Sequence, residues 1–483
     1  MSNNRVLFFK RFMGFSISAW VNAILSLIST PLITSLFSTA DVGKIQLFIT
    51  IVNLVLNFSY LGIDQAFARF FYEPPEKNNK KTFLGICLGL TGLITLVISV
   101  IIFAYGNVIS NMILGYVTYI IPVSLCISIF SNVVMRFINL NARMEKSILL
   151  FNIQAISITF ISNMSYIAVA IHKPSAENAI ILRTVLTGIA GIIFLICLRN
   201  RIDFKNMNIN KNVVITILAY SLPVCPAALL SVANNSIGQI LMKHYVSYGA
   251  IGIYSNAVTV ASIITLIQAG INHYWEPLVY ENYKTKQKEI IKMHHVISFI
   301  MIIFALCIIC SHDLIYTILI GKNFWASKQI FPLLIISPVC YTISETLGIG
   351  IRLSKKTILN IPVYLSNLIV NIGLCALLLP RMGVVGAALA SAVSSIAMLI
   401  VKAIFGECTY RCSDNYVKLA IALLTLFATA FIHTYVYECA IKYILYLIAI
   451  IITILCYTRE VKSVLLLIND LKNEFLRRSA VNE

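Results

Sequence analysis

The sequence predicts an all-α polytopic membrane protein with about fourteen transmembrane helices, arranged as two pseudo-symmetric six-helix bundles and two additional C-terminal helices. Three observations lead to this fold class. The 483 residues are 59% hydrophobic and only 12% charged, with a mean hydropathy of +0.88. Apolar segments of nearly bilayer-spanning length follow one another along the whole chain. One stretch with a helix–turn–helix pattern occurs twice.

The composition indicates that lipid is the solvent for most of the chain, because soluble domains carry about 25% charged residues. The 37 Lys and Arg residues against 19 Asp and Glu residues give a formal charge of +18, which in a soluble protein would suggest binding to nucleic acid. Here the cations lie in short loops between apolar segments, as the positive-inside rule describes. We therefore expect contact with membrane lipid and no nucleic-acid partner.

Fourteen apolar segments come close to the roughly 20 residues that a spanning helix needs. In chain order they cover residues 12–36, 45–70, 83–105, 116–139, 148–171, 179–198, 213–242, 251–279, 295–319, 330–351, 358–379, 384–405, 417–437 and 441–457. The first segment follows Lys10-Arg11 but is too long for the apolar core of a signal peptide. We therefore expect it to be an uncleaved helix.

The distribution of Lys and Arg predicts the orientation of the chain. If the N-terminus lies in the cytoplasm, the loops together with the adjoining helix ends place 29 of the 37 Lys and Arg residues on the cytoplasmic side and 8 outside. If one helix were missed or wrongly added, every later loop would change sides and the imbalance would be lost. We expect both termini to be cytoplasmic. The loops are too short to hold a folded domain, so function should reside within the membrane bundle.

The repeated stretch indicates two related halves. Residues 36–73 and 244–281 follow the same pattern, and Val42-Gly43 corresponds to Ile251-Gly252 at an offset of 209. An internal repeat of this kind is typical of a transporter whose site lies between its halves. We expect an N-terminal six-helix bundle over residues 1–200, a second one over 201–410, and helices 13 and 14 with a cytoplasmic tail over 411–483.

Several motifs carry a resemblance to a known family. They are residues 16–48 (SISAWVNAILSLISTPLITSLFSTADVGKIQLF), 60–73 (YLGIDQAFARFFYE), Ser221-Leu222-Pro223, residues 251–254 (IGIY) and residues 383–388 (GVVGAA). Together they resemble the polysaccharide (Wzx-type) flippases of the multidrug/oligosaccharidyl-lipid/polysaccharide exporter superfamily. One place departs from the pattern. Relatives often have an Asp-Arg pair in helix seven, where this chain has Gly238-Gln239.

The resemblance implies a cargo of undecaprenyl-pyrophosphate-linked oligosaccharide, such as an O-antigen or capsule repeat unit, in the bacterial cytoplasmic membrane. It also implies alternating access driven by an ion gradient or by the membrane potential, no cofactor, and partners in the polysaccharide polymerase and chain-length machinery. Such a cargo requires inward-facing cations or amide donors for its phosphates. It also requires two half-bundles that can rock against each other.

Candidate substrate-binding residues lie in helices six and seven. Pro223 and Pro226 interrupt helix seven, and polar side chains that need partners in lipid occur there and in helix six. These candidates are Arg183, Asn234, Asn235, Gln239 and Lys243. The amides either bond to neighbouring helices across a kink or contact sugar. The two cations either reach the membrane surface or bind phosphate.

Candidate ion-coupling or gate residues are charged groups inside or at the ends of predicted helices. They are Asp64, Arg69, His273, Glu276, Glu345 and Arg352. Arg352 follows Glu345 by seven residues, which places both on one helical face. This pair is either a structural ion pair or part of a proton- or sodium-linked switch. The other four residues occupy the inner ends of the two repeated helices. Asp64 and Arg69 either belong to an inner gate or form a structural pair, and His273 and Glu276 are the matching gate candidates of the second repeat.

No catalytic or metal site is predicted. The chain lacks a Walker lysine motif, and the pairs Cys307/Cys310 and Cys408/Cys412 have no second ligand pair near them in the sequence. A drug antiporter of the same superfamily remains an alternative, and it would need an acidic cavity rather than a cationic one. A membrane polysaccharide polymerase is a further alternative, but such an enzyme usually needs a large outer loop.

Overall fold

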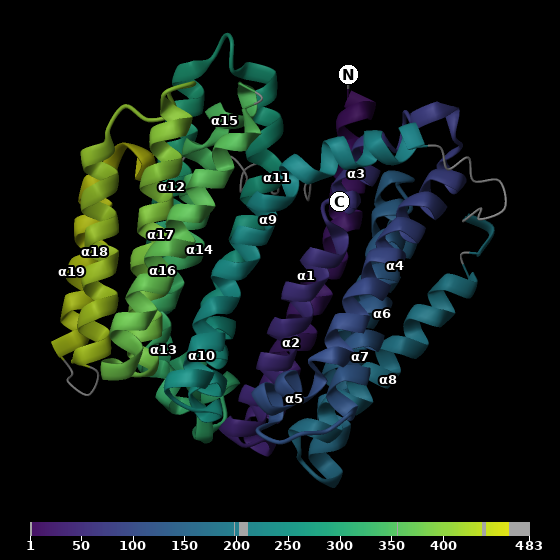
Figure 1. Ribbon diagram of the computed structural model, residues 1–483. Coiled ribbons are helices and arrows are strands. Elements are labelled where there is room, and N and C mark those ends of the chain that lie inside the picture. The colour runs from purple at the N-terminus through teal and green to yellow at the C-terminus, as the bar shows by residue number, and fades with distance from the viewer. Residues whose placement is uncertain (1, 198, 202–210, 355, 437–440, 463–483) are drawn as a thin grey trace, which may run out of the picture. The chain divides into compact units, whose positions relative to one another are not determined.

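The computed structural model describes residues 2–197, 199–201, 211–354, 356–436 and 441–462. Within these residues every regular element is a helix, which confirms the predicted all-α class (Figure 1). The chain forms two compact units. The first comprises residues 1–253 and 317–324, and the second comprises residues 254–316 and 325–483.

The first unit is a bundle of long helices connected by short ones. Its helices are α1 (Ser2–Leu36), α2 (Thr39–Tyr60), α3 (Ile63–Phe70), η1 (Pro75–Lys77), α4 (Lys80–Ala104), α5 (Gly106–Leu114), α6 (Ile120–Met144), α7 (Ile148–His172), α8 (Ala176–Cys197), η2 (Arg199–Arg201) and α9 (Lys211–Tyr245). Helix α1 packs against α7, while α6 packs against α4 and α8. Helix α9 runs along α2 and α3.

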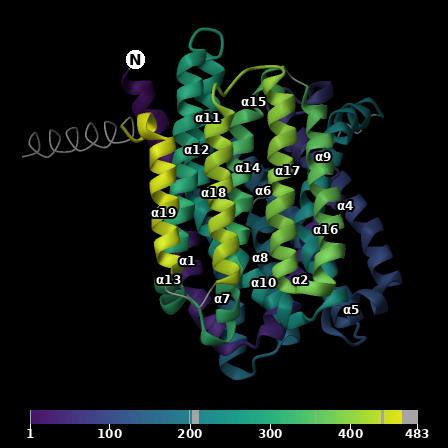
Figure 2. The ribbon, with the colours of Figure 1, turned by 90° about the vertical axis from the view of Figure 1, so that its left-hand side faces the viewer.

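Helix α10 (Tyr248–Ala261) begins in the first unit and ends in the second. The elements that follow are η3 (Ser262–Ile264), α11 (Thr265–Asn282), α12 (Gln287–Cys310), α13 (His312–Leu319), η4 (Lys322–Gln329), α14 (Phe331–Leu347), α15 (Ile349–Leu353), η5 (Thr357–Leu359), α16 (Asn360–Met382), α17 (Val384–Glu407), α18 (Tyr416–Tyr435) and α19 (Ile441–Cys456). Helix α17 packs against α14 and α16. Helices α18 and α19 form a pair that packs against α12 (Figure 2).

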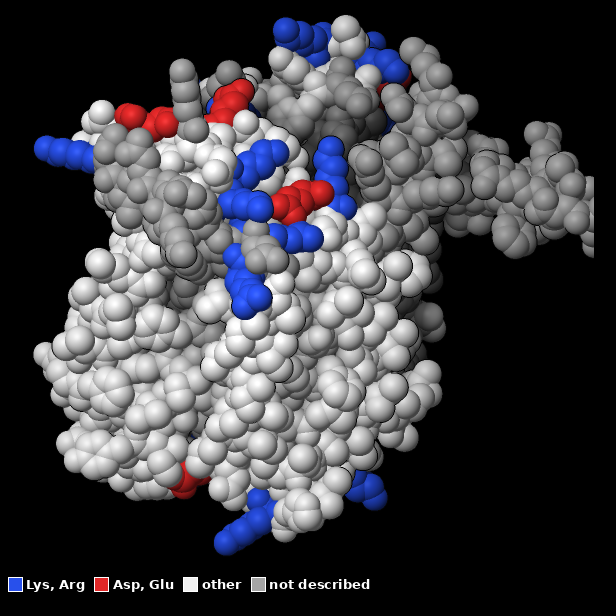
Figure 3. Space-filling view, turned by 90° about the vertical axis from the view of Figure 1, so that its right-hand side faces the viewer, with Lys and Arg blue, Asp and Glu red and all other residues white. Residues whose placement is uncertain are grey.

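The helices confirm a multi-pass membrane protein. Eleven of the described helices are long and apolar enough to cross a bilayer, and a twelfth span is possible if η4 and α14, which are bent by 60°, count as one. The stretches Trp20–Leu36 and Ile441–Cys456 are apolar but shorter. The exact number of fourteen therefore stays a prediction. Figure 3 shows a broad band without charged side chains on one face, with Lys and Arg gathered mostly at one end.

The predicted helix over residues 45–70 is broken. Leu61 and Gly62 both have positive φ angles, of 43° and 76°, and they separate α2 from α3. A Cβ atom on Gly62 would lie 2.7 Å from the carbonyl oxygen of Ser221 on α9. Glycine is therefore required by its φ angle and by the close approach of α9. In the second repeat the break is the 3₁₀ turn η3, which lies earlier in the stretch than the break in the first repeat.

The two repeated stretches cross at a pair of glycines. A Cβ atom on Gly43 would overlap the carbonyl oxygen of Tyr248, and one on Gly252 would overlap the carbonyl oxygen of Thr39. These two contacts are equivalent, because each residue is related to its counterpart by the repeat offset of 209. The first turns of α2 and α10 thus approach at backbone distance.

Candidate functional site

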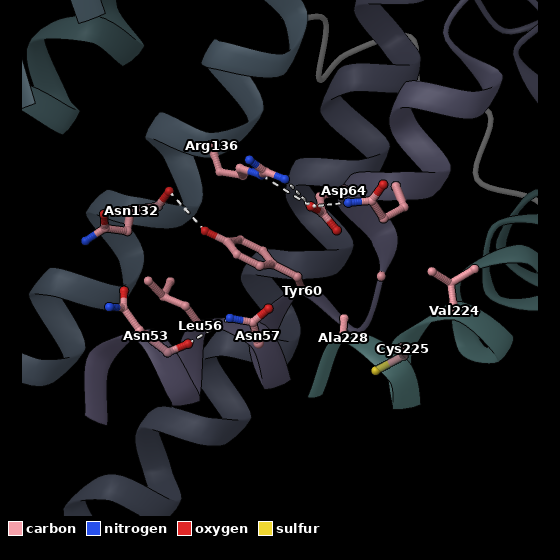
Figure 4. Close-up of a pocket in the computed structure, with 12 residues that line it drawn as sticks. Asn53, Leu56, Asn57, Tyr60, Asp64, Asn132, Arg136, Val224, Cys225 and Ala228 are labelled. Carbon is pink, nitrogen blue, oxygen red and sulfur yellow. Dashed lines mark hydrogen bonds and ion pairs between the residues drawn. The ribbon is translucent and has the colours of Figure 1, made fainter. Parts of the chain in front are cut away.

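A polar cavity of about 370 Å³ lies in the first unit, between α2, α3, α6 and α9 (Figure 4). We call it the Asp64 cavity. It is lined by Asn53, Leu56, Asn57, Tyr60, Gly62, Asp64, Gln65, Asn132, Arg136, Val224, Cys225 and Ala228. A cavity with this many amide and charged side chains is unusual among helices that are otherwise apolar, so it is a strong candidate for ligand binding.

Helix α2 supplies one wall of the Asp64 cavity because of its sequence spacing. Asn53, Asn57 and Tyr60 recur at intervals of four and three residues, which places them on the same face of the helix. The break at Leu61-Gly62 then turns the chain, so that Asp64 in the first turn of α3 lies next to Tyr60 (Figure 4). The Tyr60 hydroxyl donates to the carbonyl oxygen of Asn132 on α6, at 3.4 Å.

Asp64 is paired with Arg136 of α6. The Arg136 Nε and Nη2 atoms lie 3.2 and 2.8 Å from the same carboxylate oxygen, Oδ2. Gln65 Nε2 donates to that oxygen as well, at 3.3 Å. Asp64 is only 6% exposed. The Arg136 side chain is 41% exposed, so solvent partly screens the pair, and the buried Asp64 carboxylate depends on Arg136 more than Arg136 depends on it.

The second unit holds another group of buried charges, which we call the Glu345 cluster. Glu345 on α14 accepts from Arg352 on α15 through Oε2 and from Lys402 on α17 through Oε1. Glu345 and Lys402 are 7% and 3% exposed. The cluster therefore places two cations around one carboxylate. It contains one more cationic side chain than carboxylates, which is a formal charge of +1.

Glycine residues make room for the Glu345 cluster. Gly348 separates α14 from α15, and a Cβ atom there would lie 2.7 Å from Lys402 Cε. Tyr341 on α14 and Tyr364 on α16 place their rings 5.7 and 5.8 Å from Lys402 Nζ. The ammonium group thus has a carboxylate and two aromatic rings as neighbours, which stabilise its charge inside the bundle.

The structure brings the predicted pair Glu345 and Arg352 together, with Lys402 as a third member. Asp64 pairs with Arg136, whereas Arg69 is exposed and lies over the Phe70 ring at 5.7 Å. The backbone of His273 and Glu276 lies in α11, but their side chains fall outside the described residues.

The predicted substrate residues of helices six and seven, which correspond to α8 and α9, lie apart from the Asp64 cavity. Arg183 Nε lies 3.4 Å from Ser162 Oγ, and Lys243 Nζ lies 3.9 Å from the centre of the Tyr248 ring. Gln239 contacts the Thr50 hydroxyl of α2. Asn234 is half-buried and Asn235 is exposed, both on α9. None of these five residues lines the Asp64 cavity.

Sequence reasoning missed two cations of these sites, because Arg136 and Lys402 count with the cytoplasmic loops under the positive-inside rule. Both residues lie within predicted helices, over residues 116–139 and 384–405. A cation inside a predicted span could have identified each of them as a candidate site residue. The amides of the Asp64 cavity were also missed. The spacing of Asn53, Asn57 and Tyr60 within an uncharged helix could have revealed a polar face.

Comparisons with known proteins agree with this fold. The lipid II flippase MurJ, in an inward closed conformation, aligns with a TM-score of 0.66 at 18% sequence identity, over 95% of this chain and 99% of that chain. A multidrug resistance MATE family transporter of the MOP superfamily in an inward-facing conformation aligns with a TM-score of 0.55 at 13% identity, over 80% and 93% of the two chains. An outward-facing MATE transporter gives 0.54 at 14%, over 83% and 95%. At these identities the likeness concerns the fold alone.

Sequence comparison gives the family. A search of curated proteins finds no match. The family model described as polysaccharide biosynthesis protein matches residues 10–278, which is more than half of the chain. The motifs of residues 16–48 and 60–73 lie in the matched region, and so does the second repeated stretch up to residue 278. The chain therefore belongs to the polysaccharide biosynthesis protein family.

Proposed function

We propose that the protein is a flippase that moves undecaprenyl-pyrophosphate-linked oligosaccharide, such as an O-antigen or capsule repeat unit, across the bacterial cytoplasmic membrane. Membership of the polysaccharide biosynthesis protein family supports a role in building a surface polysaccharide. The shared fold with a lipid II flippase supports a lipid-linked cargo. The cargo is moved by alternating access and is not changed chemically, so the protein is a transporter and not an enzyme.

The observation that carries the proposal is the excess of cationic side chains over carboxylates in the Glu345 cluster. A pyrophosphate is an anion that only accepts hydrogen bonds, and it is bound best by Arg and Lys. Lys402 and Arg352 outnumber the single carboxylate Glu345. A site for a cationic drug would instead need an excess of carboxylates.

Energy coupling is assigned to the two buried carboxylates. Glu345 and Asp64 each hold a charge that a proton or sodium ion could neutralise, which would change the balance between two conformers. The gradient across the cytoplasmic membrane supplies the driving force. The polysaccharide polymerase and the chain-length regulator that use the cargo on the outer side are the expected partners.

The test is surface-polysaccharide display in a deletion strain that is complemented with the wild type, Lys402→Met or Glu345→Gln at matched protein levels. We expect the deletion to leave lipid-linked repeat units on the inner leaflet, the wild type to restore display, and both variants to reduce it at least tenfold. A deletion strain that displays its polysaccharide normally would contradict the proposal.

The fold shared with MATE multidrug transporters makes a cation antiporter the second candidate. Such an antiporter would protect the cell from cationic compounds and would have no role in polysaccharide display. If the deletion leaves the polysaccharide intact and instead sensitises cells to cationic dyes, this second function replaces the first.

A further inference from the structure

We propose that the Asp64 cavity is a saccharide subsite that binds one sugar of the headgroup through the sugar's own hydroxyl donors. This inference rests on the proposed function and deepens it. The headgroup of the cargo then has two binding sites in the chain. The Glu345 cluster of the second unit suits its phosphates, and the Asp64 cavity of the first unit suits one of its uncharged sugars.

The hydrogen bonds of the amide side chains define which atoms remain for a ligand. Asn57 Nδ2 donates to the carbonyl oxygen of Asn53 at 2.9 Å, and Asn132 Nδ2 donates to the carbonyl oxygen of Ser128 at 2.7 Å. A backbone carbonyl oxygen can only accept a hydrogen bond. The amide nitrogens of both side chains must therefore face these carbonyls, and the orientation of each amide is fixed.

The oxygens on the other side of these amides are left for the cavity. Within the described part of the chain, Asn57 Oδ1, Asn132 Oδ1 and Gln65 Oε1 have no hydrogen-bond partner. Asp64 Oδ1 is also without a partner there, because Arg136 and Gln65 both use Oδ2. The cavity thus presents a set of hydrogen-bond acceptors drawn from α2, α3 and α6.

A cavity lined by hydrogen-bond acceptors favours a ligand that donates hydrogen bonds. Phosphate oxygens at neutral pH mostly accept, so a phosphate that displaced water from these oxygens would leave them unpaired, at a cost of about 1–3 kcal/mol for each oxygen that it buries. Sugar hydroxyls donate and accept, so they can pair with the amide oxygens and also with the remaining N–H groups of Arg136. The volume of about 370 Å³ falls at the lower end of the range for small-ligand pockets.

An organic cation with N–H groups can also donate hydrogen bonds to these oxygens. The charge of the cavity distinguishes such a cation from a neutral sugar. Among the described residues of the lining, Asp64 is the one carboxylate, and it is paired with Arg136. These residues therefore have no net negative charge to attract a cation. A neutral ligand with several hydroxyl groups fits both the hydrogen-bonding pattern and the charge.

The experiment measures binding to the full-length purified protein in lipid nanodiscs by saturation-transfer NMR. The probes are methyl glycosides of glucose, galactose, mannose and N-acetylglucosamine, together with inorganic pyrophosphate and tetraethylammonium. We expect at least one glycoside to bind the wild type. Asn57→Leu and Asn132→Leu should each weaken that binding about fivefold or more, because each variant removes one acceptor.

The matched control is Asn163→Leu on α7, a half-buried asparagine that does not line the cavity, and it should bind the glycoside as the wild type does. If Asn57→Leu does not fold, Asn53→Leu replaces it, because the Asn53 side chain is exposed on α2. The proposal is overturned if no glycoside binds, or if the Asn57 and Asn132 variants lose pyrophosphate or tetraethylammonium instead. Lys402→Met should keep glycoside binding, so this assay can succeed or fail independently of the display assay.

Discussion

At the scale of single residues, Asp64 and Glu345 are two buried carboxylates that are each held by cations from other helices. The two environments differ. Asp64 is paired with one Arg, and the pair is neutral, whereas Glu345 has two cationic neighbours. A buried carboxylate that lost its partners would bear a large desolvation cost. The cations are therefore needed for stability as well as for the proposed binding of cargo.

The first prediction concerns the balance of the Glu345 cluster. Lys402→Met removes one cation but leaves Arg352, so the free energy of unfolding should fall by about 3 kcal/mol or less. Glu345→Gln leaves two cations close together and should cost at least as much. The double variant should be more stable than the sum of the two single effects predicts. Thermal unfolding of the four proteins in detergent gives this coupling energy, and strict additivity would contradict a direct interaction.

The sequence predicted some of these residues and missed others for a physical reason. Glu345 and Arg352 were recognised because helical spacing relates residues of one segment. Lys402 is 57 positions from Glu345, and such a contact depends on how α14 and α17 pack. Arg136 and Asp64 are 72 positions apart, and their pairing was missed for the same reason. Spacing within a segment can be read from one sequence, whereas contacts between segments cannot.

At the scale of elements, close helix crossings and helix breaks determine the sites. The break at Leu61-Gly62 was not predicted, because Leu rarely adopts a positive φ angle and one glycine does not by itself end a helix. The crossing of α2 and α10 was not predicted either, although its two glycines are part of the repeat. The repeat indicated which residues are equivalent, and the structure adds that Gly43 and Gly252 make equivalent contacts.

The second prediction tests the crossing of α2 and α10. Gly43→Ala and Gly252→Ala should each lower the free energy of unfolding by about 1–3 kcal/mol, because the added methyl group overlaps a backbone carbonyl oxygen. Gly89→Ala and Gly92→Ala on α4 are the controls, since a Cβ atom there meets nothing within 4 Å. They should unfold at the same temperature as the wild type or a higher one. Equal melting temperatures in all four variants would argue against a tight crossing.

The third prediction concerns the attachment of α18 and α19. His433 on α18 donates Nε2–H to the Lys328 carbonyl oxygen at 2.9 Å, and its Nδ1 accepts from the Tyr446 hydroxyl of α19. His433→Phe leaves both of those groups without this partner, at a cost of about 1–3 kcal/mol each. We expect hydrogen exchange of the α19 amides to become faster. His172→Phe, at an exposed position in the first unit, is the control and should not change this exchange.

At the scale of the whole molecule, charge and helix length together determine how the chain crosses the membrane. Lys and Arg gather mostly at one end of the face seen in Figure 3, with an uncharged band beside them. Composition already indicated a membrane protein, because the chain is 59% hydrophobic and has only 12% charged residues, about half the share of soluble domains. The number of spans is harder to predict, since apolar helices such as α5 do not all cross the bilayer.

The fourth prediction tests the orientation and the number of spans in the first unit together. The loop at Glu76 is expected in the cytoplasm and the loop at Ser175 outside. Between them lie α4, α6 and α7, which are long enough to span, and α5, whose nine residues extend only about 14 Å against a hydrocarbon core of about 30 Å. An odd number of spans places the two loops on opposite sides. A short epitope inserted after Ser175 should bind antibody on intact spheroplasts, and one inserted after Glu76 only after permeabilisation. If both epitopes were accessible on the same side, α5 would have to cross the membrane or one of the three long helices would not.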